Sequence, residues 1–487
     1  MRTKRGAEVA SQKDFRIGIV SCGVYIPWNR LRREDIAREW GSEASGEKAV
    51  ASYDEDSVTM SVEAARNCIR VNGLSKACEA LYFCSTTFPY LEKQGSAIVA
   101  EVLDLPHTTM TVDVGNTLRA GTQGLILATD AIRAGRISGA LVCASDRRLY
   151  LPGGPNETIC GDGAAAFFLG REDLIATVEA ILTTRQEIIF TWRSDRDRYV
   201  RSYEERFGLE MGYNRELVRA IDMVLKTTGL APPDIAKVVM YGFHPRHARG
   251  VMTRLGFHTN SQLEDSLLTA VGNTGVAQVP MNLIAALEKV NPGDHILVVG
   301  YGDGCDVLVL KATERVKLFQ KRCTPISHFL NHKRYVPYIK YLQWREILPT
   351  EPPPRVPPEA PSPAALWRDN RSLSLQGVKC DFCGTVQYPR SRVCIECGTK
   401  DRMVPYDLAD KVGRVVTFSH DYLASSPDKP ITVGVVDFEG GGRLMCDITD
   451  RDPKEIQVGM AVEMTFRVLR SVGGIYDYWW KAKPLRI

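Results

Sequence analysis

The stretch Asp294-His-Ile-Leu-Val-Val-Gly-Tyr-Gly-Asp-Gly304 joins an apolar run of strand length to a glycine-rich turn. The same combination occurs earlier in the chain, where Gly139-Ala-Leu-Val-Cys-Ala-Ser145 is the apolar run and Gly161-Asp-Gly163 is the turn. Short apolar runs bounded by turn residues are typical of buried strands. The correspondence indicates that this part of the chain is duplicated.

Two further landmarks repeat with a similar spacing. The apolar run 80–85 corresponds to 237–243, and Gly115-Asn-Thr117 corresponds to Gly272-Asn-Thr274. The four pairs are offset by 157, 157, about 155 and 141 residues. A nearly constant offset across four landmarks predicts two copies of one unit, packed as pseudo-symmetric halves.

The unit is of the α/β type. More strand-length apolar runs occur at 17–20, 164–169 and 307–310, and helical patterns lie between runs, at 118–134 and 279–290. Continuous apolar strands that alternate with helices favour buried sheets covered by helices.

Composition limits the classes of protein that fit. The chain has 487 residues, of which 44% are hydrophobic and 25% charged, so we expect two or three globular domains rather than a disordered chain. Lys and Arg number 62 against 58 Asp and Glu, a net charge of +4, which gives no electrostatic case for nucleic-acid or membrane-surface binding. No apolar run approaches the ~18 residues of a membrane helix.

A proline-rich segment at 349–363 predicts a linker, because proline continues neither a helix nor a sheet ladder. The polar start of the chain carries no secretory signal, and we expect it to be a flexible tail. The expected division is a tail at 1–15, an α/β domain at 16–315 with repeats at about 16–170 and 171–315, a connecting helix and linker at 316–375, a metal-binding ribbon at 376–404 and a barrel at 405–487.

Four cysteines form two close pairs, Cys380-Asp-Phe-Cys383 and Cys394-Ile-Glu-Cys397. Each pair places two thiolates on one metal through a tight knuckle, and two knuckles complete a tetrahedral zinc site. Gly384 and Gly398 follow the pairs, where a knuckle needs an unhindered backbone. The spacing predicts a structural zinc site, with no open position for a substrate, and a reducing compartment.

Five strand-like runs follow the cysteines and predict a small closed barrel: 413–419, 431–438, 443–448, 461–468 and 476–482. Such barrels also bind nucleic acid. Residues 378–487, however, contain 16 Lys and Arg against 15 Asp and Glu, which is a poor match for a phosphate backbone. We expect no nucleic-acid partner and no membrane association.

The duplicated part resembles the thiolase superfamily, and within it 3-hydroxy-3-methylglutaryl-CoA synthase and ketoacyl synthase III. The resemblance covers about residues 15–311 and rests on several motifs in one order: Gly18-Ile-Val-Ser-Cys-Gly-Val-Tyr-Ile-Pro27, Phe190-Thr-Trp-Arg-Ser194, Gly242-Phe-His-Pro245, Gly272-Asn-Thr274 and Gly300-Tyr-Gly-Asp-Gly304. It implies a duplicated αβαβα fold and an acyl-CoA as substrate or ligand.

Members of that superfamily acylate a cysteine at the start of a buried helix, where free N–H groups favour the thiolate. In Asp113-Val-Gly-Asn-Thr-Leu-Arg-Ala-Gly121 that position is Leu118, which cannot be acylated. The synthases also use a glutamate after the strand 80–85, and here our alignment places Thr86.

Two other groups of the family are retained, His244 and Asn273, and the resemblance makes them the expected donors to a thioester oxygen. Arg119 is expected either to contact a carboxylate or phosphate of the substrate or to pair with a buried acid. Cys160 and Cys305 lie near glycine-rich turns and are alternative nucleophiles, although small buried cysteines are common.

The C-terminal part resembles the zinc-ribbon and OB-fold (DUF35-type) modules found beside thiolases, which are taken to bind acyl-CoA and to bridge thiolase-like subunits. Two functions follow from the resemblance. One is carbon–carbon bond formation or cleavage of the aldol or retro-aldol type, without an acyl-cysteine. The other is a non-catalytic subunit that completes a complex with an intact thiolase. In both cases we expect a cytoplasmic homodimer.

Overall fold

The computed structural model describes residues 16–70, 73–154, 156–351, 373–424 and 426–486. The expected tail and most of the expected proline-rich linker lie outside these residues. Within the described part, no helix is both long enough and apolar enough to cross a membrane.

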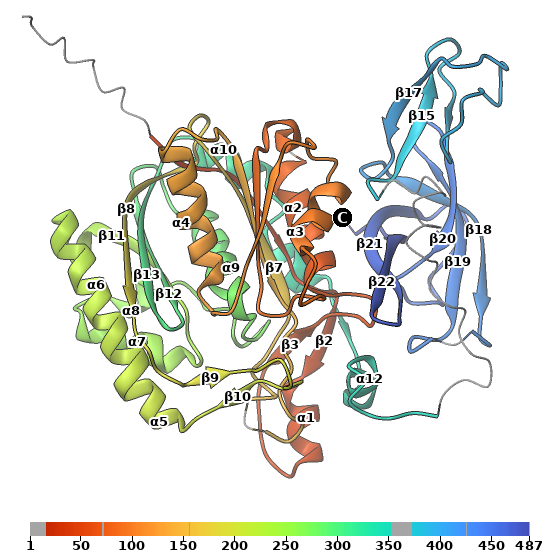
Figure 1. The fold of residues 1–487 in the computed structure, drawn as a ribbon. Coiled ribbons are helices and arrows are strands. Elements are labelled where there is room, and N and C mark those ends of the chain that lie inside the picture. Colours follow the sequence, from red (N-terminus) through yellow and green to blue (C-terminus); the bar gives the residue numbers. More distant parts are fainter. Residues whose placement is uncertain (1–15, 71–72, 155, 352–372, 425, 487) are drawn as a thin grey trace, which may run out of the picture.

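One nine-stranded sheet runs through the N-terminal domain in the order β11-β12-β13-β8-β1-β7-β6-β4-β5 (Figure 1). The strands of its first half are β1 (Gly18–Tyr25), β4 (Ala80–Cys84), β5 (Met110–Val114), β6 (Ala140–Asp146) and β7 (Gly163–Gly170). Those of its second half are β8 (Ala176–Arg185), β11 (Ile235–Met240), β12 (His295–Tyr301) and β13 (Gly304–Ala312). The halves meet where β1 pairs with β8.

The pairing pattern confirms the duplication. β4 runs parallel to β6, which is antiparallel to β7, and β11 runs parallel to β12, which is antiparallel to β13. The first half has β5 as an additional edge strand. At the equivalent place in the second half, the described residues form only a parallel bridge between Val238 and Leu263.

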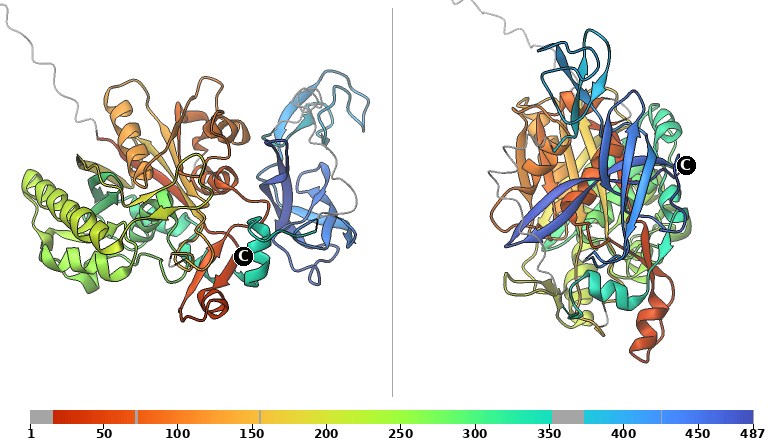
Figure 2. Two further views of the ribbon diagram at one scale, coloured as in Figure 1. Left: turned by 60° about the horizontal axis from the view of Figure 1, so that its bottom comes forward. Right: turned by 90° about the vertical axis from the view of Figure 1, so that its right-hand side faces the viewer.

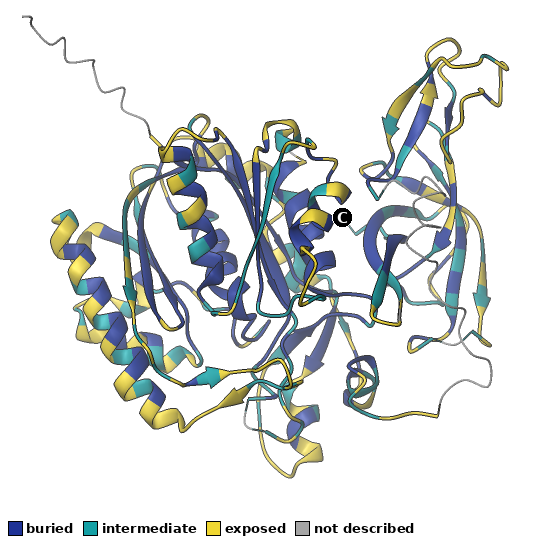
Figure 3. Ribbon diagram, viewed as in Figure 1, coloured by how far each residue is buried: buried dark blue, intermediate teal, exposed yellow. Residues whose placement is uncertain are grey.

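The helices complete five layers. α4 (Ala120–Arg133) and α9 (Gln278–Leu287) lie between the two halves, α2 (Ser57–Ile69) and α3 (Gly95–Val102) cover the first half, and α6 (Asn214–Thr228) covers the second (Figure 1). Every residue of α9 is buried, whereas α6 is buried along one face only (Figure 3). This difference follows from sequence, because α9 carries no charged residue, whereas α6 carries charged residues along its exposed side.

Shorter elements surround this core. They are α1 (Arg33–Glu39), α5 (Glu205–Phe207), α7 (Pro245–Arg254), α8 (Thr259–Gln262), α10 (Val316–Arg322), α11 (Ile326–Asn331), α12 (Tyr338–Trp344), β2 (Asn29–Arg32), β3 (Glu47–Val50), β9 (Thr191–Trp192), β10 (Arg201–Ser202) and β14 (Arg334–Tyr335), with single helical turns at Leu74–Ala77, Gly208–Tyr213, Pro232–Asp234 and Gly275–Ala277.

The C-terminal part forms a ribbon and a barrel. β15 (Gln376–Cys380), β16 (Val386–Gln387) and β17 (Met403–Asp407) make the ribbon. β18 (Gly413–Asp421), β19 (Ile431–Phe438), β20 (Arg443–Asp447), β21 (Ala461–Val472) and β22 (Ile475–Pro484) make a five-stranded sheet in the order β20-β19-β18-β21-β22. A bridge between Ile448 and Ala482 brings its two edges together, as expected for an OB barrel.

The barrel packs against the N-terminal domain of its own chain, beside α2 (Figures 1 and 2). One hydrophobic cluster continues from α2 and β4 into β21 and β22. Buried polar contacts cross the same junction. Arg66 of α2 donates to the carbonyl oxygens of Met464 and Ala409, each at 2.7 Å, and the hydroxyl of Tyr478 donates to Asp56 at 2.5 Å. The two parts are therefore joined through a shared core.

Candidate active site

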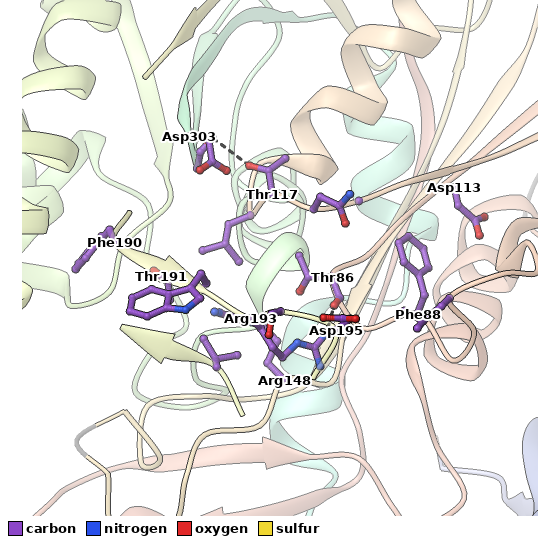
Figure 4. Close-up of a pocket in the computed structure, with 18 of the residues that line it drawn as sticks. Thr86, Phe88, Asp113, Thr117, Arg148, Phe190, Thr191, Arg193, Asp195 and Asp303 are labelled. Carbon is purple, nitrogen blue, oxygen red and sulfur yellow. Dashed lines mark hydrogen bonds between the residues drawn. The ribbon is translucent and has the colours of Figure 1, made fainter. Parts of the chain in front are cut away.

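A cavity of about 640 Å³ opens in the N-terminal domain, where the loops after β4, β5, β6 and β12 meet the segment around β9 (Figure 4). The residues that line it are Thr86, Phe88, Tyr90, Leu91, Lys93, Gln94, Asp113, Gly115, Asn116, Thr117, Leu118, Arg148, Ile188, Phe190, Thr191, Trp192, Arg193, Ser194, Asp195, Val200, Phe243, Tyr301, Gly302 and Asp303.

Leu118 lines this cavity just before α4 begins. The left-handed backbone of Asn116 (φ 67°) turns the chain from β5 into the helix. The hydroxyl of Thr117 donates to the carbonyl of Gly302 at 3.0 Å, which brings the turn after β12 close to the start of the helix. A hydrocarbon side chain thus occupies the position where the family resemblance places the acylated cysteine.

Thr86 also lines the cavity, and its polar groups are held by a buried carboxylate. Its backbone N–H and its hydroxyl donate to the two oxygens of Asp146, at 2.7 and 2.9 Å. Asp146 also accepts hydrogen bonds from Ser85, Thr87 and the N–H of Val276. Thr86 is therefore fixed as a donor and does not supply the acid–base group of a glutamate.

His244 begins α7 and is exposed. Its Nδ1 accepts a hydrogen bond from the N–H of Arg246 at 3.2 Å, as a helix cap does. Burial and then the charge of Arg246 lower the pKa of its imidazole.

The strand β11 ends at Met240 rather than at the expected residue 243. The carbonyl of Gly242 accepts a hydrogen bond from the side chain of Gln278 instead of from a neighbouring strand.

Asn273 is buried beside β11. Its Nδ2 donates to the hydroxyl of Tyr241 at 3.0 Å, and its Oδ1 accepts from the N–H of Gly275 at 2.9 Å. Neither Asn273 nor His244 is among the described residues that line the cavity. Their joint catalytic role stays a prediction.

Arg119 is not among the described residues that line the cavity, and it pairs with a buried acid. Its Nη1 lies 3.1 Å from Asp306 Oδ1 and 2.8 Å from the carbonyl oxygen of Thr184. Of the two expectations for this residue, the pairing with a buried acid describes its contacts in the structure.

The two alternative cysteines are both buried thiols. Burial raises the pKa of Cys160 to about 11 and that of Cys305 well above its usual value, so both keep their protons at neutral pH. No cysteine is present among the described residues that line the cavity.

Three polar residues of the cavity were not predicted as site residues, although Arg193 and Tyr301 lie in two of the quoted motifs. Arg148 is 5% exposed, and Arg193 lies beside it on the segment of β9. The hydroxyl of Tyr301 is buried and has no hydrogen-bond partner in the described part of the chain, and burial raises its pKa, so it remains a proton donor. The place of Tyr301 at the end of β12 is the signal that would have found it, whereas Arg148, two residues after β6, has no such signal in the sequence.

The four ribbon cysteines converge as predicted. Their Sγ atoms all lie within 4.8 Å of one another, and the Cys380–Cys397 and Cys383–Cys394 pairs are 3.8 and 3.5 Å apart. Bond lengths of ~2.3 Å around tetrahedral zinc require sulfur atoms at about these separations. A hydrogen bond with Thr385 lowers the pKa of Cys383 to about 6, which favours the thiolate that zinc needs. The set fits a structural Zn²⁺.

Gly384 and Gly398 have left-handed backbones (φ 79° and 70°). Their N–H groups donate to the carbonyl oxygens of Cys380 and Cys394, at 2.9 and 3.1 Å. Both knuckles therefore close as the spacing predicted.

Family models match three parts of the chain. Residues 225–310 match the C-terminal domain of 3-oxoacyl-[acyl-carrier-protein] synthase III, 372–401 match the rubredoxin-like zinc ribbon domain of ChsH2, and 406–467 match the C-terminal OB-fold domain of ChsH2. The expected domain boundaries between these regions stay predictions.

Curated relatives and solved structures agree on the N-terminal part. The hydroxymethylglutaryl-CoA synthase of Pyrobaculum aerophilum is 31% identical over 345 residues, which cover 68% of this chain and 98% of that protein. The enzyme of the same name from Methanopyrus kandleri is 30% identical over 344 residues, which cover 68% of this chain and 98% of that protein. The structure of MvaS in complex with 3-hydroxy-3-methylglutaryl coenzyme A has the same fold, with a TM-score of 0.63 and 21% identity, covering 71% of this chain and 94% of that one. The chain therefore belongs to the hydroxymethylglutaryl-CoA synthase family within the thiolase superfamily, and it adds to this fold a zinc ribbon and an OB-fold domain of the ChsH2 type.

Proposed function

We propose that the chain binds an acyl-CoA and makes or breaks a carbon–carbon bond without forming an acyl-enzyme. One observation carries the proposal: Leu118, which the family resemblance places at the nucleophile position, lines the cavity, and no cysteine is present among the described lining residues. Family membership and the retained cavity support binding of a CoA ester.

An aldol or retro-aldol step suits such a cavity. In the cleavage direction a base takes the proton of a 3-hydroxyl group, the bond between C2 and C3 breaks to give a carbonyl product, and the resulting thioester enolate takes a proton at C2. Tyr301 supplies the donor that stabilises the enolate oxygen, because its buried hydroxyl has no other hydrogen-bond partner among the described residues. Asp195 and Asp303 are the candidate bases, since Asp113 is already bonded to the first N–H groups of α3.

The test is an assay of the full chain with 3-hydroxyacyl-CoA esters in the cleavage direction and with an acyl-CoA plus an aldehyde or ketone in the reverse direction. We expect turnover by the wild type and a loss of about 10²-fold in kcat for Tyr301→Phe. Tyr203→Phe, on an exposed tyrosine, is the control. Turnover that is unchanged in Tyr301→Phe excludes the assigned donor.

A second candidate is a non-catalytic subunit that binds acyl-CoA beside an intact thiolase. The contacts of Thr86 and Asn273 favour it, because the hydrogen bonds of both side chains are used within the protein. In that case the isolated chain binds a CoA ester but shows no turnover. Turnover appears only when a thiolase with its own cysteine, taken from the native source, is added. The zinc-thiolate site supports a reducing, cytoplasmic setting for either function.

A further inference from the structure

We infer that Arg148 and Arg193 together bind a carboxylate carried by the acyl group of the substrate. The inference builds on the proposed function, since it assigns a chemical class to the acyl group that the same cavity holds. It rests on two arginines in one cavity wall for which the described residues provide no carboxylate in an ion pair.

Arg148 is the buried member of the pair. Its Nη2 donates to the hydroxyl of Tyr150 at 3.1 Å, whereas Nη1 is buried and makes no hydrogen bond of good geometry with the described residues. Its head group lies near the hydroxyl of Tyr241, which is neutral. Buried guanidinium groups are normally paired with an anion, so this arrangement leaves one to be supplied by a ligand.

Arg193 lies on the exposed side of the same wall (Figure 4). Its Nη2 donates to the carbonyl oxygen of Thr86, which is a neutral partner. Burial lowers the pKa of Arg193, the charge of Asp146 raises it, and the positive charge of Arg148 lowers it. An anion placed between the two guanidinium groups offsets the repulsion between them.

The acids around the pair do not replace that anion. The charge of Asp146 acts on both arginines, but its two oxygens already accept five hydrogen bonds from Ser85, Thr86, Thr87 and Val276. Asp195 lines the cavity and is exposed to solvent, and Asp197 is bonded to Ser194 and Arg201. Asp146, whose oxygens already accept five hydrogen bonds, is thus one carboxylate near two guanidinium groups.

The place of the pair favours a carboxylate on the acyl group over a phosphate of CoA. Arg193 contacts Thr86, and Leu118 lines the same cavity, so the arginines lie at the end where the family's reacting groups stand. The phosphates of CoA are separated from the thioester by the whole pantetheine arm. The planar donors of arginine suit a carboxylate.

The experiment compares glutaryl-CoA with valeryl-CoA, two esters with five-carbon acyl chains that differ in the terminal carboxylate, and uses free CoA as a third probe. Binding to the full chain is measured by calorimetry. We expect glutaryl-CoA to bind about tenfold tighter or more. Arg148→Gln and Arg193→Gln should each remove most of that preference. Arg196→Gln, an exposed arginine of the same segment outside the lining, should keep it.

Equal affinity for the two esters overturns the inference, and so does a preference for glutaryl-CoA that survives both substitutions. In either case, binding of valeryl-CoA leaves the proposed function standing. If the variants lose as much affinity for free CoA as for glutaryl-CoA, the two arginines bind a phosphate of CoA. This result also overturns the inference. Failure of the wild type to bind either ester contradicts the proposed function itself, and the inference falls with it. If Arg148→Gln does not fold, Arg193→Gln decides, because its side chain lies on the exposed side of the wall.

Discussion

Arg467 of the barrel and Glu55 of the N-terminal domain form a fully buried ion pair, with 2.5 Å between Nη1 and Oε1. The same guanidinium lies 2.6 Å from Asp450, and the neighbouring Lys481 lies 2.9 Å from Asp54. The C-terminal module is thus fixed to its own chain by charges that have no access to water. Any partner subunit has to bind a surface other than this junction.

The first prediction concerns this ion pair. Arg467→Met should lower the free energy of unfolding by about 3–5 kcal/mol, because it leaves buried carboxylates without a partner. Arg443→Met is the matched control, since Arg443 pairs with Asp437 at the surface of the barrel and should contribute about 0–1 kcal/mol. Urea unfolding of both variants checks the difference, and equal losses would contradict it.

The second prediction is a pH dependence that arises from Glu63 on α2. Burial alone would raise its pKa, but the charges of Lys483 and Arg66 outweigh burial and hold the pKa well below its ordinary 4.5. A lowered folded-state pKa contributes stability above pH 4.5 that is lost as the pH falls below this value. We expect Glu63→Gln to be less stable than wild type by about 3 kcal/mol at pH 7. The gap should narrow steadily below pH 4.5 in thermal or urea unfolding, and a gap that stays constant down to pH 3 would exclude this origin.

The third prediction is one zinc per chain, held by Cys380, Cys383, Cys394 and Cys397. Cys383→Ser should lose the metal and unfold the ribbon, because structural zinc binding is coupled to folding. Cys323→Ser removes a half-buried thiol outside the cluster and should retain a full equivalent. Metal analysis of the purified chains gives the answer, and well under one equivalent in the wild type would disprove the site.

The fourth prediction is that the wild-type chain forms no acyl-enzyme. Incubation with a labelled acyl-CoA, followed by intact-mass measurement, should show no adduct, since Leu118 has no nucleophilic atom and Cys160 and Cys305 are buried thiols. Leu118→Cys should acquire an adduct, because the start of α4 favours a thiolate. An adduct on Cys160 or Cys305 of the wild type would overturn the cysteine-independent reaction.

The fifth prediction is a homodimer. β5 is half-buried and pairs only with β4 among the described strands, so one edge of the nine-stranded sheet is open. Unpaired edges are normally covered, and thiolase-like domains usually pair through their central sheets. Sedimentation equilibrium should give twice the chain mass of 54.2 kDa at micromolar concentration. A monodisperse monomer would refute the expectation.

The sequence was most informative where local chemistry determines the structure. The cysteine knuckles, with a glycine after each pair, define the metal site almost without reference to the rest of the chain. Apolar runs predicted seven strands of the sheet. The duplication predicted which strands of one half correspond to those of the other. β5 and β8 were not predicted, because Thr111, Asp113 and the alternating polar residues of 176–185 interrupt any continuous apolar run.

The candidate site depends on contacts that no spacing reveals. The family resemblance suggested a catalytic role for His244, and the structure places this residue as the cap of α7, outside the described residues that line the cavity. Arg148 follows β6 by two residues and gives no signal of its own. Only the fold places it beside Arg193, which is 45 residues away in the chain.

The buried junction between the domains changes what the covalent connection contributes. Because α2, β21 and β22 share one hydrophobic cluster, the folded chain behaves like a permanent heterodimer whose two subunits happen to be joined. The connection acts mainly before and during assembly, by giving each half a high effective concentration of the other. Every cavity is consequently made together with one ribbon and one barrel, in fixed one-to-one proportion and independent of how much protein the cell contains.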